Sequence, residues 1–193
     1  MLNFEDYPDI TKGDIFWRAP PDSLKRIPFL YDRAASSLHM LFIMGSYTKR
    51  EGYTPEIHVA ACIRAALVEF IGIEESLKNG GVKFQIRNTS SPLLHFMRLL
   101  RNYQVHIGQH QVQKRSVEVT FAGDEVSMPV AIIDNLNADQ FMDLDAIKKY
   151  KNYTHEEVEK MISLFEEQQC RLGVYELLRR GVNRLVSEVE NAF

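Results

Sequence analysis

The sequence has few of the features that mark secreted or membrane-spanning proteins. Its uninterrupted apolar stretches, such as residues 41–44, are far shorter than the roughly 20 residues that cross a bilayer. The N-terminal residues include acids and lack both a basic head and an apolar run, so we expect no secretory signal there. Only two cysteines are present, Cys62 and Cys170, and each lies in an apolar-periodic segment. The cysteines therefore predict reduced, buried thiols in a cytoplasmic protein, and the short apolar stretches predict that it contacts no membrane.

Acidic residues are missing from one long segment, residues 76–117. That segment holds seven basic residues, which leaves 16 of the 23 basic residues against all 26 acidic ones in the rest of the chain. A positive segment on an otherwise acidic protein is what a polyanion-binding surface requires. The alternative is that these cations scatter over a solvated surface. The seven residues are Lys78, Lys83, Arg87, Arg98, Arg101, Lys114 and Arg115.

The hydrophobic pattern is that of one mostly helical domain, residues 1–193. With 45% hydrophobic and 25% charged residues, the chain has the composition of a globular protein with a sizeable core. Apolar residues recur every three or four positions over four segments, which predicts helices at 23–47, 56–78, 93–109 and from 154 to near the C-terminus. Pro28 is expected to kink or delay the first helix. The last segment is one long helix, or two helices that meet near Gly173.

Between the third and last helices the periodicity changes from that of a helix to that of a strand. Residues 116–121 alternate, turn residues follow around Gly123, and residues 127–133 form a second apolar run. Pro129 makes that second run an edge or ragged strand. We therefore predict a four-helix bundle with a small β-hairpin insertion at about residues 112–142.

The third predicted helix carries distinct apolar and polar stripes. Projection at about 100° per residue places one apolar stripe toward the core. That stripe consists of Phe96, Leu99, Leu100, Tyr103 and Ile107. Asn102, His106 and His110 recur at intervals of four on a neighbouring polar stripe, which His95 joins. Arg101 lies about 140° from His106, so a site that uses both needs the reach of the arginine or a second, facing copy of the helix. This requirement favours a dimer.

The run from Arg101 and Asn102 to His106 resembles the R-N-x-x-x-H motif of HEPN (higher eukaryotes and prokaryotes nucleotide-binding) domains. The two apolar residues directly before the motif, Leu99 and Leu100, also fit this resemblance. This resemblance implies a HEPN-like four-helix bundle. It also implies a homodimeric endoribonuclease of the toxin or defence type, with two motifs facing each other across the interface. Such an enzyme cleaves RNA without a metal or other cofactor, through attack of the ribose 2′-hydroxyl on the adjacent phosphate. Its partners would be RNA, a second copy and a cognate antitoxin or regulator.

The residue types fit that chemistry. An arginine fork binds a phosphate bidentately and stabilises the charge that grows on it, so we assign Arg101 to the phosphate. A histidine titrates near neutral pH and can move a proton to or from an oxygen, so His106 is the predicted acid/base. Asn102 is assigned a supporting role, in which it orients the imidazole or caps the helix. The predicted substrate-binding residues are Arg98, His110, Lys114 and Arg115.

Two alternatives remain at the level of sequence. In a non-catalytic HEPN-like interaction or nucleotide-binding module, Arg101 would pair with a carboxylate and His106 would be satisfied in a packed interface. A zinc site is the second alternative, because His106 and His110 have the i, i+4 spacing of a helical metal pair, with His95 near them. No Glu or Cys accompanies that pair within the acid-free segment.

Overall fold

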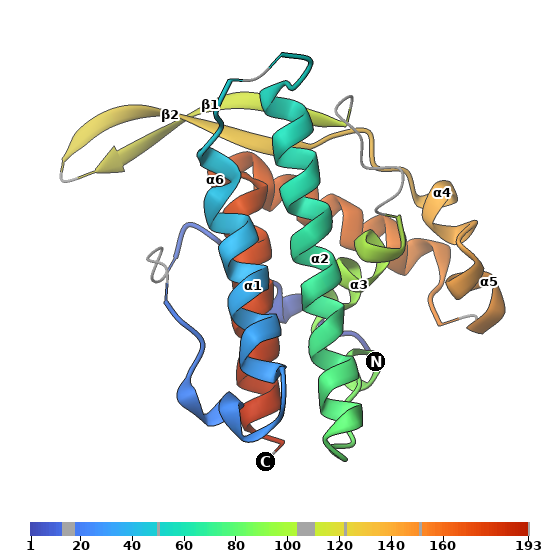
Figure 1. Ribbon diagram of the computed structural model, residues 1–193. Coiled ribbons are helices and arrows are strands. Elements are labelled where there is room, and N and C mark those ends of the chain that lie inside the picture. The colour runs from blue at the N-terminus through green and yellow to red at the C-terminus, as the bar shows by residue number, and fades with distance from the viewer. Residues whose placement is uncertain (13–17, 50, 104–110, 122, 151, 193) are drawn as a thin grey trace.

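Four long helices and a β-hairpin make up the fold, as the computed structural model shows (Figure 1). It describes residues 1–12, 18–49, 51–103, 111–121, 123–150 and 152–192. The expectation of a mostly helical chain with a hairpin between the third and last long helices is confirmed. The sequence did not predict the two short helices α4 and α5. The elements are α1 (Leu30–Phe42), α2 (Pro55–Asn79), α3 (Pro92–Tyr103), β1 (Val112–Phe121), β2 (Asp124–Ile133), α4 (Ala138–Met142), α5 (Asp145–Tyr150) and α6 (His155–Glu190).

Capping residues set the starts of α2 and α6 where the sequence predicted them. The Thr54 side chain accepts a hydrogen bond from the Ile57 backbone at 3.3 Å, and Pro55 occupies the first turn, where its missing N–H costs nothing. Thr154 and Glu157 form a reciprocal capping box at the start of α6. Helix α2 ends at Asn79, and Gly81 then takes a φ of 78° that a side chain would disfavour.

Helix α1 is shorter than its periodicity predicted. The segment expected to be helical over 23–47 is instead a 3-10 turn at Asp22–Arg26, the helix itself, and a second 3-10 turn at Ile43–Gly45. Pro28 delays the start of α1. Phe29, the residue directly before α1, takes a φ of 65°. The prediction of a single helix there was wrong at both ends.

One hydrophobic cluster joins the long helices to the short ones and to the base of the hairpin. On α3 the expected stripe is confirmed, because Phe96, Leu99, Leu100 and Tyr103 are all buried, while Ile107 lies outside the described residues. Cys62 is buried as predicted, but Cys170 is exposed, because α6 turns that position away from the bundle. Within the described residues, none of the helices has the length and apolar composition needed to cross a bilayer.

The hairpin lies across one end of the bundle and extends past it on one side (Figure 1). Its strands pair antiparallel from Val112 with Ile133 to Phe121 with Asp124, and Gly123 forms the turn with a φ of 96°. Only the base is buried: Val112, Ile132 and Ile133 are at most 4% exposed. The remainder of the hairpin therefore has little packing to hold it beyond its own strand pairing.

The hairpin is docked where α6 bends. One turn before the bend, the Gln169 side chain donates to the Ile133 carbonyl at 2.6 Å and accepts from the Ile133 N–H at 2.8 Å. Gly173 then takes a φ of 85°, and a Cβ there would stand 2.9 Å from the Val130 Cβ and 3.2 Å from the Ala131 carbonyl oxygen. Glycine at this position therefore permits both the bend and the close approach of β2. The second predicted alternative is confirmed, because α6 consists of two helical segments that meet at Gly173, whose backbone is not helical.

Candidate functional site

The last turn of α3 carries Arg101 and Asn102, both half-buried. The Arg101 Nη1 donates a long hydrogen bond of 3.4 Å to the Asn102 Oδ1. The Arg101 Nε is buried, and among the described residues it has no hydrogen-bond partner. None of the ion pairs among the described residues includes Arg101. His106 and His110, the other predicted members of the site, lie outside the described residues.

Tyr103 fixes the turn that presents Arg101. Its hydroxyl donates to the Gln140 Oε1 at 2.6 Å, and its ring lies 4.7 Å from the Phe141 ring, centroid to centroid. Burial raises the pKa of this phenol, so it stays protonated and remains a donor. Both partners belong to α4. This short helix, which the sequence pattern did not predict, therefore supports the candidate site.

His95 does not belong to the polar stripe, and that part of the prediction was wrong. Its side chain is 5% exposed. The Nε2 donates to the Thr89 carbonyl at 3.0 Å, and the Nδ1 accepts from the Tyr153 hydroxyl at 2.7 Å. Burial lowers the pKa of His95 and raises that of Tyr153 to about 12, so both are neutral near pH 7.

This arrangement bears on the zinc alternative. Both ring nitrogens of His95 are already bonded, so the imidazole has no lone pair to offer a metal alongside His106 and His110. Within the described ranges, no group of three or more His, Cys, Asp or Glu side chains is placed to hold a metal ion. His95 acts as an anchor that joins α3 to the segment before it and to the residues that precede α6.

The acid-free segment is split between two distant parts of the molecule. Arg98 lies on α3 one turn before Arg101 and lines a cleft with Lys78, near the end of α2. Lys114 on β1 instead pairs with Glu56 at 3.6 Å, in the first turn of α2. The 22 residues between positions 56 and 78 span roughly 33 Å of helix. The predicted substrate-binding residues Arg98 and Lys114 thus belong to separate surfaces.

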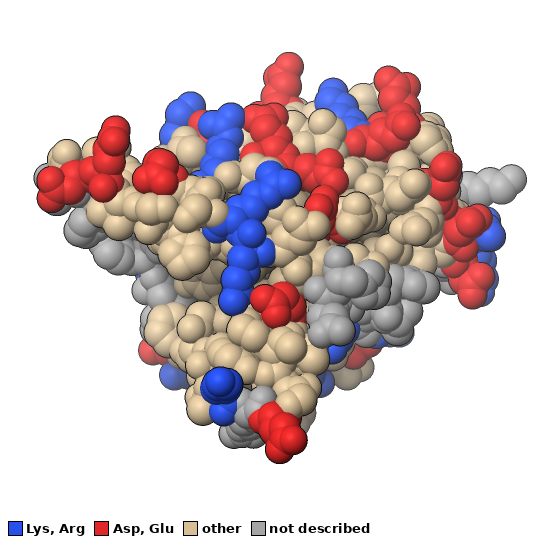
Figure 2. All heavy atoms as spheres, turned by 90° about the horizontal axis from the view of Figure 1, so that it is seen from above, with Lys and Arg blue, Asp and Glu red and all other residues tan. Residues whose placement is uncertain are grey.

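The hairpin face of the molecule carries mixed charge. Viewed from the hairpin side, a narrow band of Lys and Arg crosses the face between groups of Asp and Glu (Figure 2). Arg115 on β1 is exposed, and its Nη1 lies 3.4 Å from the Cys170 Sγ. Three exposed acids, Glu118, Asp124 and Glu125, lie toward the free end of the hairpin. A polyanion would meet repulsion at the free end of the hairpin.

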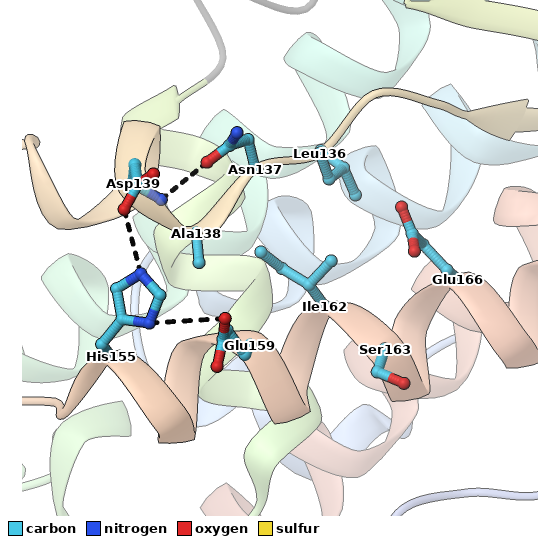
Figure 3. A pocket seen from close by; sticks show the side chains of 9 residues that line it. All are labelled: Leu136, Asn137, Ala138, Asp139, His155, Glu159, Ile162, Ser163 and Glu166. Atoms are coloured by element: carbon cyan, nitrogen blue, oxygen red, sulfur yellow. Dashed lines mark hydrogen bonds and ion pairs between the residues drawn. The ribbon is translucent and has the colours of Figure 1, made fainter.

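A second candidate site is a cleft between α6 and the segment that leads into α4 (Figure 3). Its volume is about 400 Å³. His155 lies between two carboxylates, with its Nε2 3.0 Å from the Asp139 Oδ1 and its Nδ1 3.5 Å from the Glu159 Oε1. The hydrogen bond to Asp139 raises the pKa of His155. The lining residues are Leu136, Asn137, Ala138, Asp139, His155, Glu159, Ile162, Ser163 and Glu166.

This second cleft is unsuited to phosphate. Burial, and then the nearby charge of Asp134, raise the pKa of Glu166. The carboxylates of Asp139 and Glu159 add further negative charge to the same walls. The sequence did not predict this cleft because its acids come from two separate elements, α4 and α6, which only the fold brings together. The Arg101 turn is therefore the better candidate for a nucleic-acid site.

Comparison with protein families, with curated protein sequences and with solved structures gives no match to this chain. We therefore infer its function from the residues themselves.

Proposed function

We propose that the protein is a metal-independent endoribonuclease of the HEPN type, acting in a toxin or defence role, with Arg101 and His106 at its site. The support is the R-N-x-x-x-H pattern together with the position of its first two residues at the end of a bundle helix. The fixed Tyr103 holds this turn in place from the core side. A rigid helix is a suitable support for groups that must be precisely positioned for catalysis.

The observation that carries the proposal is the state of the Arg101 guanidinium. A half-buried cation with a buried, unbonded N–H is costly unless an anion joins it. The non-catalytic alternative expected a carboxylate partner for Arg101, and no described carboxylate fills that place. A phosphate would satisfy the guanidinium fork with two charge-assisted hydrogen bonds. Arg101 is therefore poised for an external oxyanion.

The proposed reaction needs only these groups. His106 accepts the proton of the ribose 2′-hydroxyl, and the 2′-oxygen attacks the adjacent phosphorus. Arg101 stabilises the negative charge that builds on the phosphoryl oxygens. The bond to the 5′-oxygen then breaks and this oxygen takes up a proton, which yields a 2′,3′-cyclic phosphate and a 5′-hydroxyl. Asn102 acts as a positioning residue, because its Oδ1 accepts from Arg101.

The proposed site is shared by two subunits. In the helical projection of the sequence, Arg101 and His106 lie about 140° apart, so one copy of this segment would not direct both side chains toward one phosphate. We propose that two copies of the motif face each other across a twofold axis, so that the arginine of one copy and the histidine of the other act on one phosphate. RNA and a second copy of the chain are thus the proposed partners.

The test is cleavage of single-stranded RNA in EDTA by the purified protein and by its His106→Ala variant, with analysis of the product ends. The proposal expects 2′,3′-cyclic phosphate ends from the wild type and none from a folded, equally oligomeric variant. Cleavage by both proteins would place the activity elsewhere, and cleavage by neither would favour the non-catalytic interaction module.

A further inference from the structure

A larger cleft lies between the second half of α2, the segment that follows it, and α3. Its volume is about 670 Å³, within the range of small-ligand sites in proteins. The wall-forming segment is fixed at both ends: Val82 donates to the Leu77 carbonyl at 2.9 Å, and Ile86 donates to the Glu74 Oε2 at 3.3 Å. Ile86 is also fully buried. The cleft is therefore preformed.

Three cations line this cleft: Lys78 on α2, Lys83 on the connecting segment and Arg98 on α3. None of the three has an ion-pair or hydrogen-bond partner among the described residues. This contrasts with other cations of the chain, such as Arg33, which pairs with Glu69 at 2.8 Å. Three positive side chains that line one cleft from three elements, unpaired among the described residues, provide a site for an anionic group.

The rest of the lining matches a nucleotide better than a simple anion. Phe84 is half-buried and offers an aromatic surface in the same cleft, against which a base can stack. Glu75 is exposed at the cleft and can accept hydrogen bonds from ribose hydroxyls or from a base amine. The other acid, Glu74, is engaged with the Ile86 N–H. Cations, an aromatic surface and an acceptor together match phosphate, base and sugar.

We infer that this cleft binds a nucleotide unit, with its phosphate held by Lys78, Lys83 and Arg98 and its base against Phe84. The unit belongs to a single-stranded RNA or to a free nucleotide, which share this chemistry. Arg98 precedes Arg101 by one turn of α3, so a strand bound here would extend toward the proposed catalytic site. The inference does not require cleavage, and it stands whether or not Arg101 and His106 form an active site.

The experiment measures binding of a labelled RNA octamer and of adenosine monophosphate to the full chain carrying His106→Ala, which prevents cleavage of the probe. Arg98→Ala and Lys78→Ala should each weaken binding roughly 10- to 100-fold. Phe84→Leu keeps apolar volume against the core but removes the stacking surface, and should weaken binding about tenfold. Lys148→Ala removes an exposed cation that pairs with Asp143 outside the cleft, and serves as the matched control.

The RNA octamer and adenosine monophosphate distinguish RNA from a free nucleotide as the bound ligand. Cleft-dependent binding of the octamer without the mononucleotide identifies RNA, and each phosphate that a variant no longer binds should lower the salt slope by about 0.7. Cleft-dependent binding of the mononucleotide identifies a free nucleotide. Lys78 is exposed, so its variant should fold even if Arg98→Ala does not. Binding that is absent, or equal in the cleft variants and in Lys148→Ala, overturns the inference.

Discussion

Helix α3 and strand β1 share the acid-free segment of the sequence, yet their cations have opposite surroundings. Arg98 and Arg101 on α3 are half-buried and form no ion pairs with described residues. Lys114 and Arg115 on β1 are exposed, and Lys114 pairs with Glu56. The difference shows that a run of positive charge in sequence does not define one binding surface. Pairing distinguishes a cation such as Lys114, which already has a carboxylate partner, from Arg98 and Arg101, which form no ion pair with a described residue.

The largest effect is expected for Arg101→Ala. Removing a group that stabilises transition-state charge should lower RNA cleavage by roughly 100- to 1000-fold. Millimolar guanidinium ion should restore part of the activity, because it supplies the missing fork, whereas ammonium should not. Initial cleavage rates with each additive measure this. Full activity in Arg101→Ala would remove Arg101 from the site.

Gly173→Ala should affect stability rather than cleavage. The variant combines a φ of 85° with a Cβ placed 2.9 Å from the Val130 Cβ, and it should lose about 2 kcal/mol of unfolding free energy. Gly123→Ala is the matched control, because it has a positive φ of 96° but no atom within 4 Å of the new Cβ. Denaturant unfolding and cleavage per folded molecule separate the two effects. A loss of cleavage per folded molecule, in addition to the loss of stability, would make the hairpin part of the site.

The contributions of His95 and His155 to stability should depend on pH in opposite directions. Burial lowers the pKa of His95, so the unfolded chain binds its proton first and the stability due to His95 is lost as pH falls below about 6.5. Asp139 raises the pKa of His155, so that contribution is present at acid pH and is lost as pH rises through the folded pKa. Melting temperatures at pH 5.5 and 7.5 should show the gap between wild type and His95→Gln shrinking in acid. The gap to His155→Gln should grow. A trend of the same sign for both would contradict the assigned hydrogen bonds.

The smallest effect is expected for Lys114→Ala. Its exposed ion pair with Glu56 contributes at most about 1 kcal/mol to stability, and cleavage should change less than about threefold. Arg98→Ala, which removes a cation from α3, should weaken RNA binding far more. Side-by-side titrations at one salt concentration provide the measurement. Equal losses of RNA binding in Lys114→Ala and Arg98→Ala would show that both surfaces contribute to one RNA-binding site.

The sequence predicted the parts of the fold that depend on neighbouring residues. The starts of the helices near residues 56 and 154 and the turn around Gly123 were predicted. Thr54 with Pro55, and Thr154 with Glu157, are the local signals that lie at those two starts. The burial of His95 was not predictable in this way, because its Tyr153 partner lies 58 residues away in the chain. Helices α4 and α5 are only 5 and 6 residues long, too short to show a helical period.

The candidate site shows the same difference between local sequence signals and contacts that arise only in the fold. The motif identified Arg101 and Asn102 from the sequence, but their lack of a carboxylate partner became visible only in the fold. The cleft of Lys78, Phe84 and Arg98 was missed as a unit because its residues come from three elements. The absence of acids from residues 76–117 was the signal that pointed to this region.

The central claim, that Arg101 of one subunit and His106 of another form one site, is tested by mixed dimers. Arg101→Ala and His106→Ala chains are co-expressed with different tags, and dimers that carry both tags are purified. Each variant alone should be inactive. The mixed dimer has one intact site of two and should recover roughly half of the wild-type RNA cleavage. Mixed dimers that form but stay inactive, while the wild type cleaves, would contradict the shared site.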